Sequence, residues 1–292
     1  MKKLLITGQN SYIGTSVEKY LLTNEEEFKI DTIDLINPEW ETIDFSKYDS
    51  IFHVAGIAHF SKDPSKKQLY YKVNTELTEK VAKKAKDEGV NQFIFMSSII
   101  VYGDSTKSNR IITPETKPSP SDFYGDSKWQ AERRLEKLRS DDFKIAIIRP
   151  PMIYGKGSKG NYPRLSKLSK KIPIIPDYQN ERSMLYIGNF CEFVRQIILT
   201  NSEGVYFPQN KEYVSTSNLM IVIAKLSGHK FISTKLLNPL INLLFFNDNI
   251  KKMFGNLTYS KSLSQYDFEY QIYNFENSLI ETEKETNENC NY

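Results

Sequence analysis

The sequence has few of the residues that build disulfide frameworks or metal sites. Its 292 residues include two cysteines, Cys191 and Cys290, and three histidines. Two cysteines far apart in the chain give neither a disulfide framework nor the paired spacing of a zinc site. We therefore expect no metal centre, with Cys191 an inert buried thiol and Cys290 a solvated one.

The chain also lacks a charge excess and a membrane-spanning apolar run. Its 39 Lys and Arg nearly balance 36 Asp and Glu, which argues against nucleic-acid binding. Leu236–Phe246 is strongly apolar but shorter than the roughly 20 residues that cross a bilayer. It suits a core or interface helix, with peripheral membrane contact as the alternative. The apolar start of the chain is too short for a secretory signal, so we expect a cytoplasmic protein.

Apolar runs alternate with helical patterns through the first half of the chain. Five runs read as strands: residues 3–7, 28–34, 50–56, 91–98 and 143–148. This alternation predicts an α/β fold with a doubly wound parallel sheet, whose ligands bind at the carboxyl ends of the strands. Gly8, Ala55, Ser98 and Pro150 fall at such ends, so we expect them to surround one crevice.

The pattern becomes irregular after residue 150, and Gly155, Gly157 and Gly160 follow one another closely. We assign residues 1–155 to a dinucleotide-binding domain. Residues 156–280 are expected to form mainly a smaller, mixed substrate-binding region. The acidic, Asn-rich residues 281–292 read as a disordered tail.

A glycine-bearing turn, Gly8–Gly14, lies between the first predicted strand and a helical pattern. In this layout, N–H groups at a helix start bind a dinucleotide pyrophosphate; for the glycines alone, an ordinary turn is the alternative. The residues assigned to the cofactor, from this turn and from strand ends, are Gly8, Asn10, Ser11, Tyr12, Ile13, Gly14, Asp34, Ala55, Gly56 and Pro150, with Tyr124 and Lys128 beside them.

Asp34 ends the second predicted strand, twenty positions after Gly14. A carboxylate there accepts hydrogen bonds from the adenosine ribose and repels a 2′-phosphate. Asp34 therefore favours NAD, although NADP stays possible. Asp31, on the opposite strand face, is the weaker candidate.

Tyr124 and Lys128 lie four residues apart at a predicted helix start that Ser121 or Asp122 can cap. Residues i and i+4 share a helix face. A neighbouring cation stabilises a phenolate and lowers the pKa of a tyrosine, which then donates and accepts protons. The same spacing also occurs by chance on solvated helices, so the rest of the chain decides between the two interpretations.

Five motifs in order resemble the extended short-chain dehydrogenases/reductases, the NAD-dependent nucleotide-sugar epimerase/dehydratase family. They are the turn from Thr7 to Gly14, the strand Phe95–Gly103, the Tyr124/Lys128 pair, Arg149–Gly155 and the segment after Arg182. The resemblance implies a Rossmann-like fold and a homodimer that pairs the Tyr124 helix. One departure is Ser11, which replaces the middle glycine of the turn; it is small, so we expect binding to survive.

The resemblance also implies residue roles. Ser98, Tyr124 and Lys128 would be catalytic and Asn74 would help to arrange the site. Asn161 and Arg182 would hold the diphosphate of a UDP-sugar, which Ser98 and Tyr124 also contact; a surface ion pair is the alternative for Arg182. His59 would line the sugar pocket or be a plain loop residue, whereas His53 and Ser97 read as structural. Tyr102 would be a packing aromatic or a cofactor contact.

The family's 4,6-dehydratases carry an acid/base pair directly after the serine or threonine. Here those positions are Ile99 and Ile100, which cannot move protons, so dehydration is disfavoured. Looser similarities of Phe254–Ser260 and two other segments to capsule and O-antigen enzymes favour a 4-ketoreductase acting on a UDP-N-acetyl-4-keto-6-deoxyhexose. The alternative is a UDP-hexose or UDP-N-acetylhexosamine 4-epimerase with bound NAD, and a non-catalytic dinucleotide sensor is less favoured.

Overall fold

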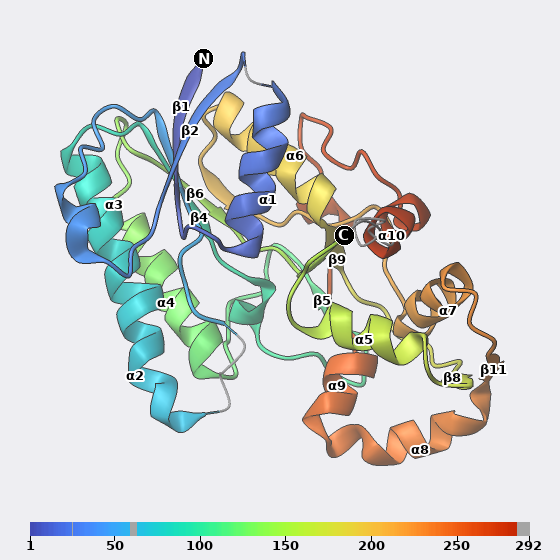
Figure 1. The fold of residues 1–292 in the computed structure, drawn as a ribbon. Helices are drawn as coiled ribbons and strands as arrows, with labels where there is room; N and C mark the ends of the chain where they lie inside the picture. The colour runs from blue at the N-terminus through green and yellow to red at the C-terminus, as the bar shows by residue number, and fades with distance from the viewer. Residues whose placement is uncertain (25, 59–62, 285–292) are drawn as a thin grey trace.

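The computed structural model describes residues 1–24, 26–58 and 63–284 (Figure 1). Its main element is a six-stranded sheet in the order β10-β6-β4-β3-β1-β2, in which every neighbouring pair is parallel. The strands are β1 (Lys2–Thr7), β2 (Phe28–Ile33), β3 (Ser50–His53), β4 (Gln92–Met96), β6 (Lys144–Ile148) and β10 (Gly204–Tyr206). The order reverses between β1 and β3, which is where doubly wound sheets bind ligands. The predicted fold class is confirmed.

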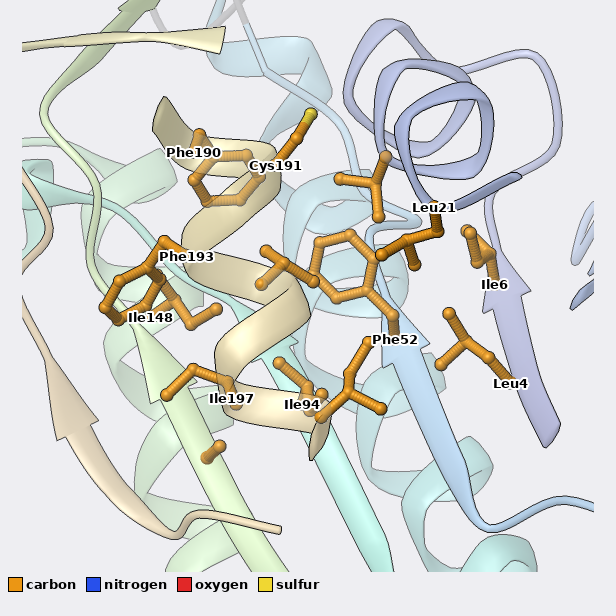
Figure 2. Packing of buried hydrophobic residues seen from close by; sticks show 14 of the residues in the cluster. Leu4, Ile6, Leu21, Phe52, Ile94, Ile148, Phe190, Cys191, Phe193 and Ile197 are labelled. Atoms are coloured by element: carbon orange, nitrogen blue, oxygen red, sulfur yellow. The ribbon is translucent and has the colours of Figure 1, made fainter. Parts of the chain in front are cut away.

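The sheet is buried on both faces because successive apolar side chains of each strand point to opposite sides. Helices α1 (Tyr12–Leu21) and α6 (Ile187–Leu199) cover one face (Figure 1). There the sheet contributes Phe52 and Ile94, which pack with Phe190 and Ile197 of α6 in one core (Figure 2). Cys191 is buried in the same core, as the sequence predicts.

Helices α3 (Thr78–Asp87) and α4 (Phe123–Glu136) cover the other face (Figure 1). Leu5, Phe93 and Phe95 point to this side and pack with residues of both helices. This second core, which includes Ala131 and Leu135, holds α4 against the sheet.

A second lobe contains the short elements of the later chain (Figure 1). Its helices are α5 (Asn161–Ser169), α7 (Thr216–Leu226), α8 (Asn238–Leu243), α9 (Asp248–Phe254) and α10 (Phe275–Glu283). Its strands form three parallel pairs: β5 (Ile111–Ile112) with β12 (Thr258–Tyr259), β7 (Met152–Tyr154) with β9 (Met184–Tyr186), and β8 (Ile174–Pro176) with β11 (Ile232–Thr234).

After residue 155 the chain also returns to the large sheet, since α6 covers one face and β10 pairs with β6. The assignment of residues 156–280 to mainly a substrate-binding region stays a prediction. One predicted boundary needs correction. The predicted disordered tail begins too early, since α10 runs to Glu283. The Glu283 carboxylate accepts hydrogen bonds from Tyr162 Oη at 2.5 Å and Ser166 Oγ at 3.0 Å. Residues 285–292 lie outside the described residues.

We predict that Phe52→Ala lowers the free energy of unfolding by about 3–5 kcal/mol, because it leaves a cavity between the sheet and α6. The Phe52 side chain is fully buried, with its ring centroid 6.3 Å from that of Phe190. Urea unfolding checks this. Ile36→Ala is the control: Ile36 is 91% exposed, so a change within about 0.5 kcal/mol is expected. Equal effects of both substitutions would contradict the assigned core.

Candidate functional site

The turn after β1 lies against the ends of two neighbouring strands. The backbone N–H groups of Gly8 and Gln9 both donate to the Ile33 carbonyl, at 2.9 and 3.1 Å. Gly8 has φ +97°, and a Cβ there would lie 2.9 Å from the Ala55 nitrogen. Only glycine combines this conformation with this close approach. The turn and residue 55 therefore meet at the point where the strand order reverses.

Ser11 caps helix α1, since its Oγ accepts a hydrogen bond from Gly14 N at 3.1 Å. Ser11, which replaces the family's middle glycine, thus stabilises the start of helix α1. The N–H groups of Tyr12 and Ile13 lie in the first helical turn, where no intrahelical acceptor exists. They are suited to bind an anion at the positive end of the helix dipole. These residues fit a dinucleotide pyrophosphate.

The structure separates the two candidate ribose carboxylates. Asp34 is exposed directly after β2, next in the chain to Ile33, whose carbonyl accepts the hydrogen bond from Gly8 N. The Asp34 Oδ1 accepts a hydrogen bond from Ile36 N at 2.9 Å. Asp31 accepts a hydrogen bond from Tyr48 Oη at 2.6 Å, which gives it a structural partner. Asp34 keeps acceptor capacity beside the turn, so the preference for NAD stays a prediction that rests on this residue.

Asn74 links three parts of the site. It is fully buried in a π-helical turn, Tyr71–Leu77, which joins α2 (Lys67–Tyr70) to α3. Its Oδ1 accepts from Ile57 N at 2.9 Å, and its Nδ2 donates to Ile57 O and Ser127 Oγ, both at 3.0 Å. Both amide donors are therefore used within the protein. This geometry suits a positioning residue better than one that touches substrate.

Ser98 and Tyr124 come together where β4 ends and α4 begins. Asp122 caps α4, as predicted, with its Oδ1 accepting from Gly125 N at 2.8 Å. Ser98 hydrogen-bonds the half-buried Tyr124. Burial raises the pKa of Tyr124 to about 12, and the Ser98 hydrogen bond opposes that rise. The expected lowering of this pKa by Lys128 is not observed, and burial of the phenol sets its direction.

The Lys128 ammonium is buried beside the same strand. Its Nζ donates to the Met96 carbonyl at 2.9 Å and lies 4.7 Å from the centroid of the Phe95 ring. Burial lowers the pKa of Lys128 to about 8, and the Glu132 carboxylate opposes this shift. A Cβ on Gly56 would lie 3.2 Å from Nζ and 2.9 Å from Asn74 Oδ1. The predicted residues Gly56, Asn74 and Lys128 therefore share one small volume.

A buried ion pair that sequence reasoning missed lies directly behind this volume. Glu132 and Arg149 are both buried, with Nη2 to Oε2 at 2.5 Å and Nε to Oε1 at 3.1 Å. Ser97 Oγ also donates to Glu132, and Arg149 Nη1 donates to Tyr102 Oη at 2.6 Å. Ser97 thus has the structural role expected of it, and the Tyr102 hydroxyl is engaged by Arg149. In the sequence, this pair could have been suspected from Glu132 alone, a carboxylate four residues after Lys128 on a helix face that is otherwise apolar.

The carboxyl ends of β3 and β6 carry two further predicted residues. The His53 ring is buried between Thr7 Oγ1 at 2.8 Å and Thr78 Oγ1 at 3.0 Å, which confirms it as a core histidine. Desolvation, assisted by the charge of Lys128, lowers the pKa of His53 to about 3, so the ring is neutral. Pro150 is buried and its carbonyl accepts from Ile99 N at 2.9 Å, next to Ser98. His59 lies outside the described residues.

Arg182 and Asn161 belong to the second lobe. Arg182 is half-buried and its Nη1 donates to the Gly255 carbonyl at 3.1 Å. Burial lowers the pKa of Arg182 to about 10, against the effect of the nearby Asp104 charge. A guanidinium has five N–H donors, so several stay available for an anion. Asn161 is exposed at the start of α5, and no hydrogen bond among the described residues joins it to Arg182 or Ser98.

Gly125 controls how closely α4 approaches the Ser98 turn. A Cβ at this position would lie 2.7 Å from the Ile100 carbonyl oxygen. We predict that Gly125→Ala destabilises the protein by about 1–3 kcal/mol through overpacking, although alanine favours an exposed helix by about 1 kcal/mol. Thermal or urea unfolding measures the change. Arg133→Ala, exposed on the same helix, is the control; stabilisation by Gly125→Ala would refute the close contact.

The chain matches the NAD dependent epimerase/dehydratase family over residues 4–207. It is 32% identical to a UDP-glucose 4-epimerase of Vibrio cholerae over 214 residues, which cover 66% of this chain and 65% of that protein. It is 29% identical over 260 residues to an N-acetyl-alpha-D-glucosaminyl-diphospho-ditrans,octacis-undecaprenol 4-epimerase of Escherichia coli O157:H7, covering 81% of this chain and 76% of that protein.

Solved structures share the fold at lower identity. A UDP-glucuronic acid 4-epimerase from Bacillus cereus, in complex with NAD, has a TM-score of 0.73 and 19% identity, covering 96% of this chain and 94% of that one. A dTDP-4-dehydrorhamnose reductase from Clostridium acetobutylicum has the same TM-score with 18% identity, covering 96% and 98%.

These matches confirm the resemblance drawn from the sequence motifs, and the family's name agrees with the predicted nicotinamide dinucleotide cofactor. The choice between NAD and NADP stays a prediction. Because the family match extends over more than half of the chain, this protein belongs to the NAD dependent epimerase/dehydratase family.

Proposed function

We propose that this protein is a 4-epimerase that acts, with NAD, on a UDP-hexose or UDP-N-acetylhexosamine. The observation that carries the proposal is the convergence of Ser98, Tyr124 and the buried Lys128 beside the turn that fits a dinucleotide. The two curated relatives with 4-epimerase names support epimerisation over reduction. This reverses the order that the looser sequence similarities favour.

A nicotinamide dinucleotide held by the Gly8–Gly14 turn would supply the hydride acceptor and donor for C4 of the sugar. Tyr124 is the residue placed to take and return the proton of the C4 hydroxyl, and Ser98 hydrogen-bonds the same oxygen. With its pKa near 12, the Tyr124 phenol is neutral in the structure described. Its work as a base therefore depends on nearby positive charge, which Lys128 supplies in its protonated form.

The rest of the site limits the reaction to this exchange. Ile99 is buried in an apolar cluster with Val101 and Tyr102, directly after Ser98. Neither Ile99 nor Ile100 has a group that removes a proton from C5, which argues against dehydration. Arg182 is proposed to bind the diphosphate through its remaining donors, with Asn161 at the start of α5 as a second contact.

A 4-ketoreductase is the second candidate. It is favoured by the similarity of Phe254–Ser260 to capsule and O-antigen enzymes, and this segment lies against the proposed diphosphate residue. The backbone of Arg182 forms an isolated parallel β-bridge with Leu257, and the Arg182 guanidinium donates a hydrogen bond to the Gly255 carbonyl. The same Ser98 and Tyr124 pair would serve a single reduction equally well.

The discriminating experiment incubates the protein with UDP-N-acetylglucosamine, its 4-epimer and its 4-keto-6-deoxy derivative, with and without NADH or NADPH. Interconversion of the two epimers without net consumption of reduced cofactor supports the epimerase. Stoichiometric consumption on the ketosugar alone identifies the reductase and overturns the first proposal.

Tyr124→Phe is predicted to lower kcat by at least about 100-fold, the lower range for loss of a general acid–base group. Cofactor binding should change little, because the dinucleotide turn is untouched. Turnover and NAD titration on the same preparation separate the two effects. Tyr206→Phe, which changes a hydroxyl on the edge strand β10, is the matched control. Turnover that survives Tyr124→Phe would refute the assigned proton role.

Glu132→Gln is predicted to shift the basic limb of the pH profile of kcat/KM to lower pH. The Glu132 carboxylate raises the pKa of Lys128 against burial; without it, Lys128 loses its proton at a lower pH. Leaving Arg149 as an unpaired buried cation adds to this shift and costs about 3–5 kcal/mol of stability.

The control is Glu136→Gln on the same helix, where the carboxylate is half-exposed and pairs with Arg139 at 2.8 Å. That change should leave the profile in place, because surface pairs contribute about 0–1 kcal/mol. An unchanged or higher-pH limb in Glu132→Gln would contradict the proposed electrostatic support of Lys128.

A further inference from the structure

The apolar segment noted in the sequence presents an exposed apolar face. It folds as a 3-10 turn (Lys235–Leu237), helix α8 and a second 3-10 turn (Leu244–Phe246). Four side chains at helical spacing, here named the apolar stripe, are exposed to solvent: Leu236 at 87%, Leu240 at 52%, Leu243 at 72% and Phe246 at 73%. Neighbouring apolar side chains exposed together mark an interaction surface more often than a plain solvated one.

The protein holds this segment with its polar side chains turned inward. Asn238 Nδ2 donates to the Asp177 carbonyl at 2.9 Å, and Asn242 Oδ1 accepts from Tyr178 Oη at 3.1 Å. Ile241 and Phe245 are buried against Tyr178 and Phe254. A helix that faced water would present its asparagines outward and bury its leucines. The outward leucines are therefore a fixed feature of the fold.

The exposed apolar area continues onto the adjoining strand pair. Ile232 in β11 and Ile174 in β8 are partners in register, and they are 69% and 46% exposed. β11 leads directly into the 3-10 turn that carries Leu236. Figure 1 shows α8 at the outer end of the second lobe, away from the large sheet, so a partner there leaves the sheet and its helices uncovered.

The surrounding sequence is basic, although the chain as a whole is nearly balanced in charge. Residues 225–252 contain a single acidic residue, Asp248, and five lysines. The lysines are Lys225, Lys230, Lys235, Lys251 and Lys252. Two copies packed symmetrically through this face would bring like charges together, and lysine is depleted at protein interfaces. A surface of opposite charge fits better than a second copy.

We propose that the apolar stripe docks this protein on an anionic lipid bilayer, with the leucines and Phe246 entering the interface and the lysines bound to the headgroups. Partly buried amphipathic helices with basic flanks bind membranes in this way. No helix in the described part of the chain could span a bilayer, so the attachment is peripheral. The proposal is independent of the reaction proposed above, because lipid binding is measured without substrate.

The test is co-sedimentation of the full chain with vesicles of phosphatidylglycerol and phosphatidylcholine, compared with phosphatidylcholine alone. Binding to the anionic vesicles is expected, at least about tenfold above the neutral ones, and it should weaken at high salt. Leu240→Glu combined with Leu243→Glu should reduce vesicle binding by about tenfold or more, since it places charge in the apolar layer. Both positions are exposed, so circular dichroism and NAD binding should be unchanged.

Ile36→Glu is the matched control, because Ile36 is exposed outside the stripe; it should leave vesicle binding unchanged. In a second measurement, the fluorescence of Phe246→Trp should shift to the blue on adding anionic vesicles. Absence of anionic vesicle binding, or equal loss in Ile36→Glu and the double variant, would overturn the proposal. So would a double variant that changes only the oligomeric state in gel filtration, which would assign the stripe to a second copy.

Discussion

The buried ammonium of Lys128 is the constraint around which the site is built. A buried charge is costly unless it is hydrogen-bonded and paired. Here the Met96 carbonyl binds the ammonium directly, the Phe95 ring faces it, and Glu132 supplies a negative charge one helical turn further along α4. Burying Glu132 in turn requires Arg149, which therefore lies at the carboxyl end of β6.

Close backbone contacts give this arrangement its geometry. Gly125 lets α4 approach the Ile100 carbonyl, and Gly56 lets the loop after β3 pass over Lys128 and Asn74. The π-helical turn places Asn74 where it bonds both that loop and Ser127 of α4. π-helical turns inside helices are frequent at functional sites. Helix α4, the loop after β3 and the π-helical turn are thus joined by direct hydrogen bonds.

The sequence predicted those parts of the fold that depend on residues close together in the chain. The strand runs, the glycine turn and the Asp122 cap follow from hydrophobic period and capping chemistry. The β5–β12 pairing joins residues far apart in the chain, so no local pattern predicts it. For the Glu132–Arg149 pair, the local pattern shows a carboxylate on an apolar helix face but does not identify its partner on the next strand. Helix α10 was missed because Glu283, which reads as part of an acidic tail, bonds to α5.

One electrostatic expectation had the wrong sign for a physical reason. The i,i+4 spacing of Tyr124 and Lys128 was expected to lower the pKa of Tyr124, but spacing gives no information on burial. Desolvation of the phenol raises that pKa, the nearby Tyr70 and Asp122 raise it further, and the Ser98 hydrogen bond opposes the rise. The ammonium is oriented toward Met96, on β4, rather than toward the phenol.

The central claim is that the sugar is oxidised and reduced again at the same carbon. The most direct measurement follows a deuterium label at C4 of the UDP-sugar through conversion to its epimer, by mass spectrometry and proton NMR. The account predicts that the label stays at C4 and that none enters from deuterated solvent. Loss of the label to water, or entry of solvent deuterium at C4, would show that a proton rather than a hydride leaves the carbon, and would contradict the account.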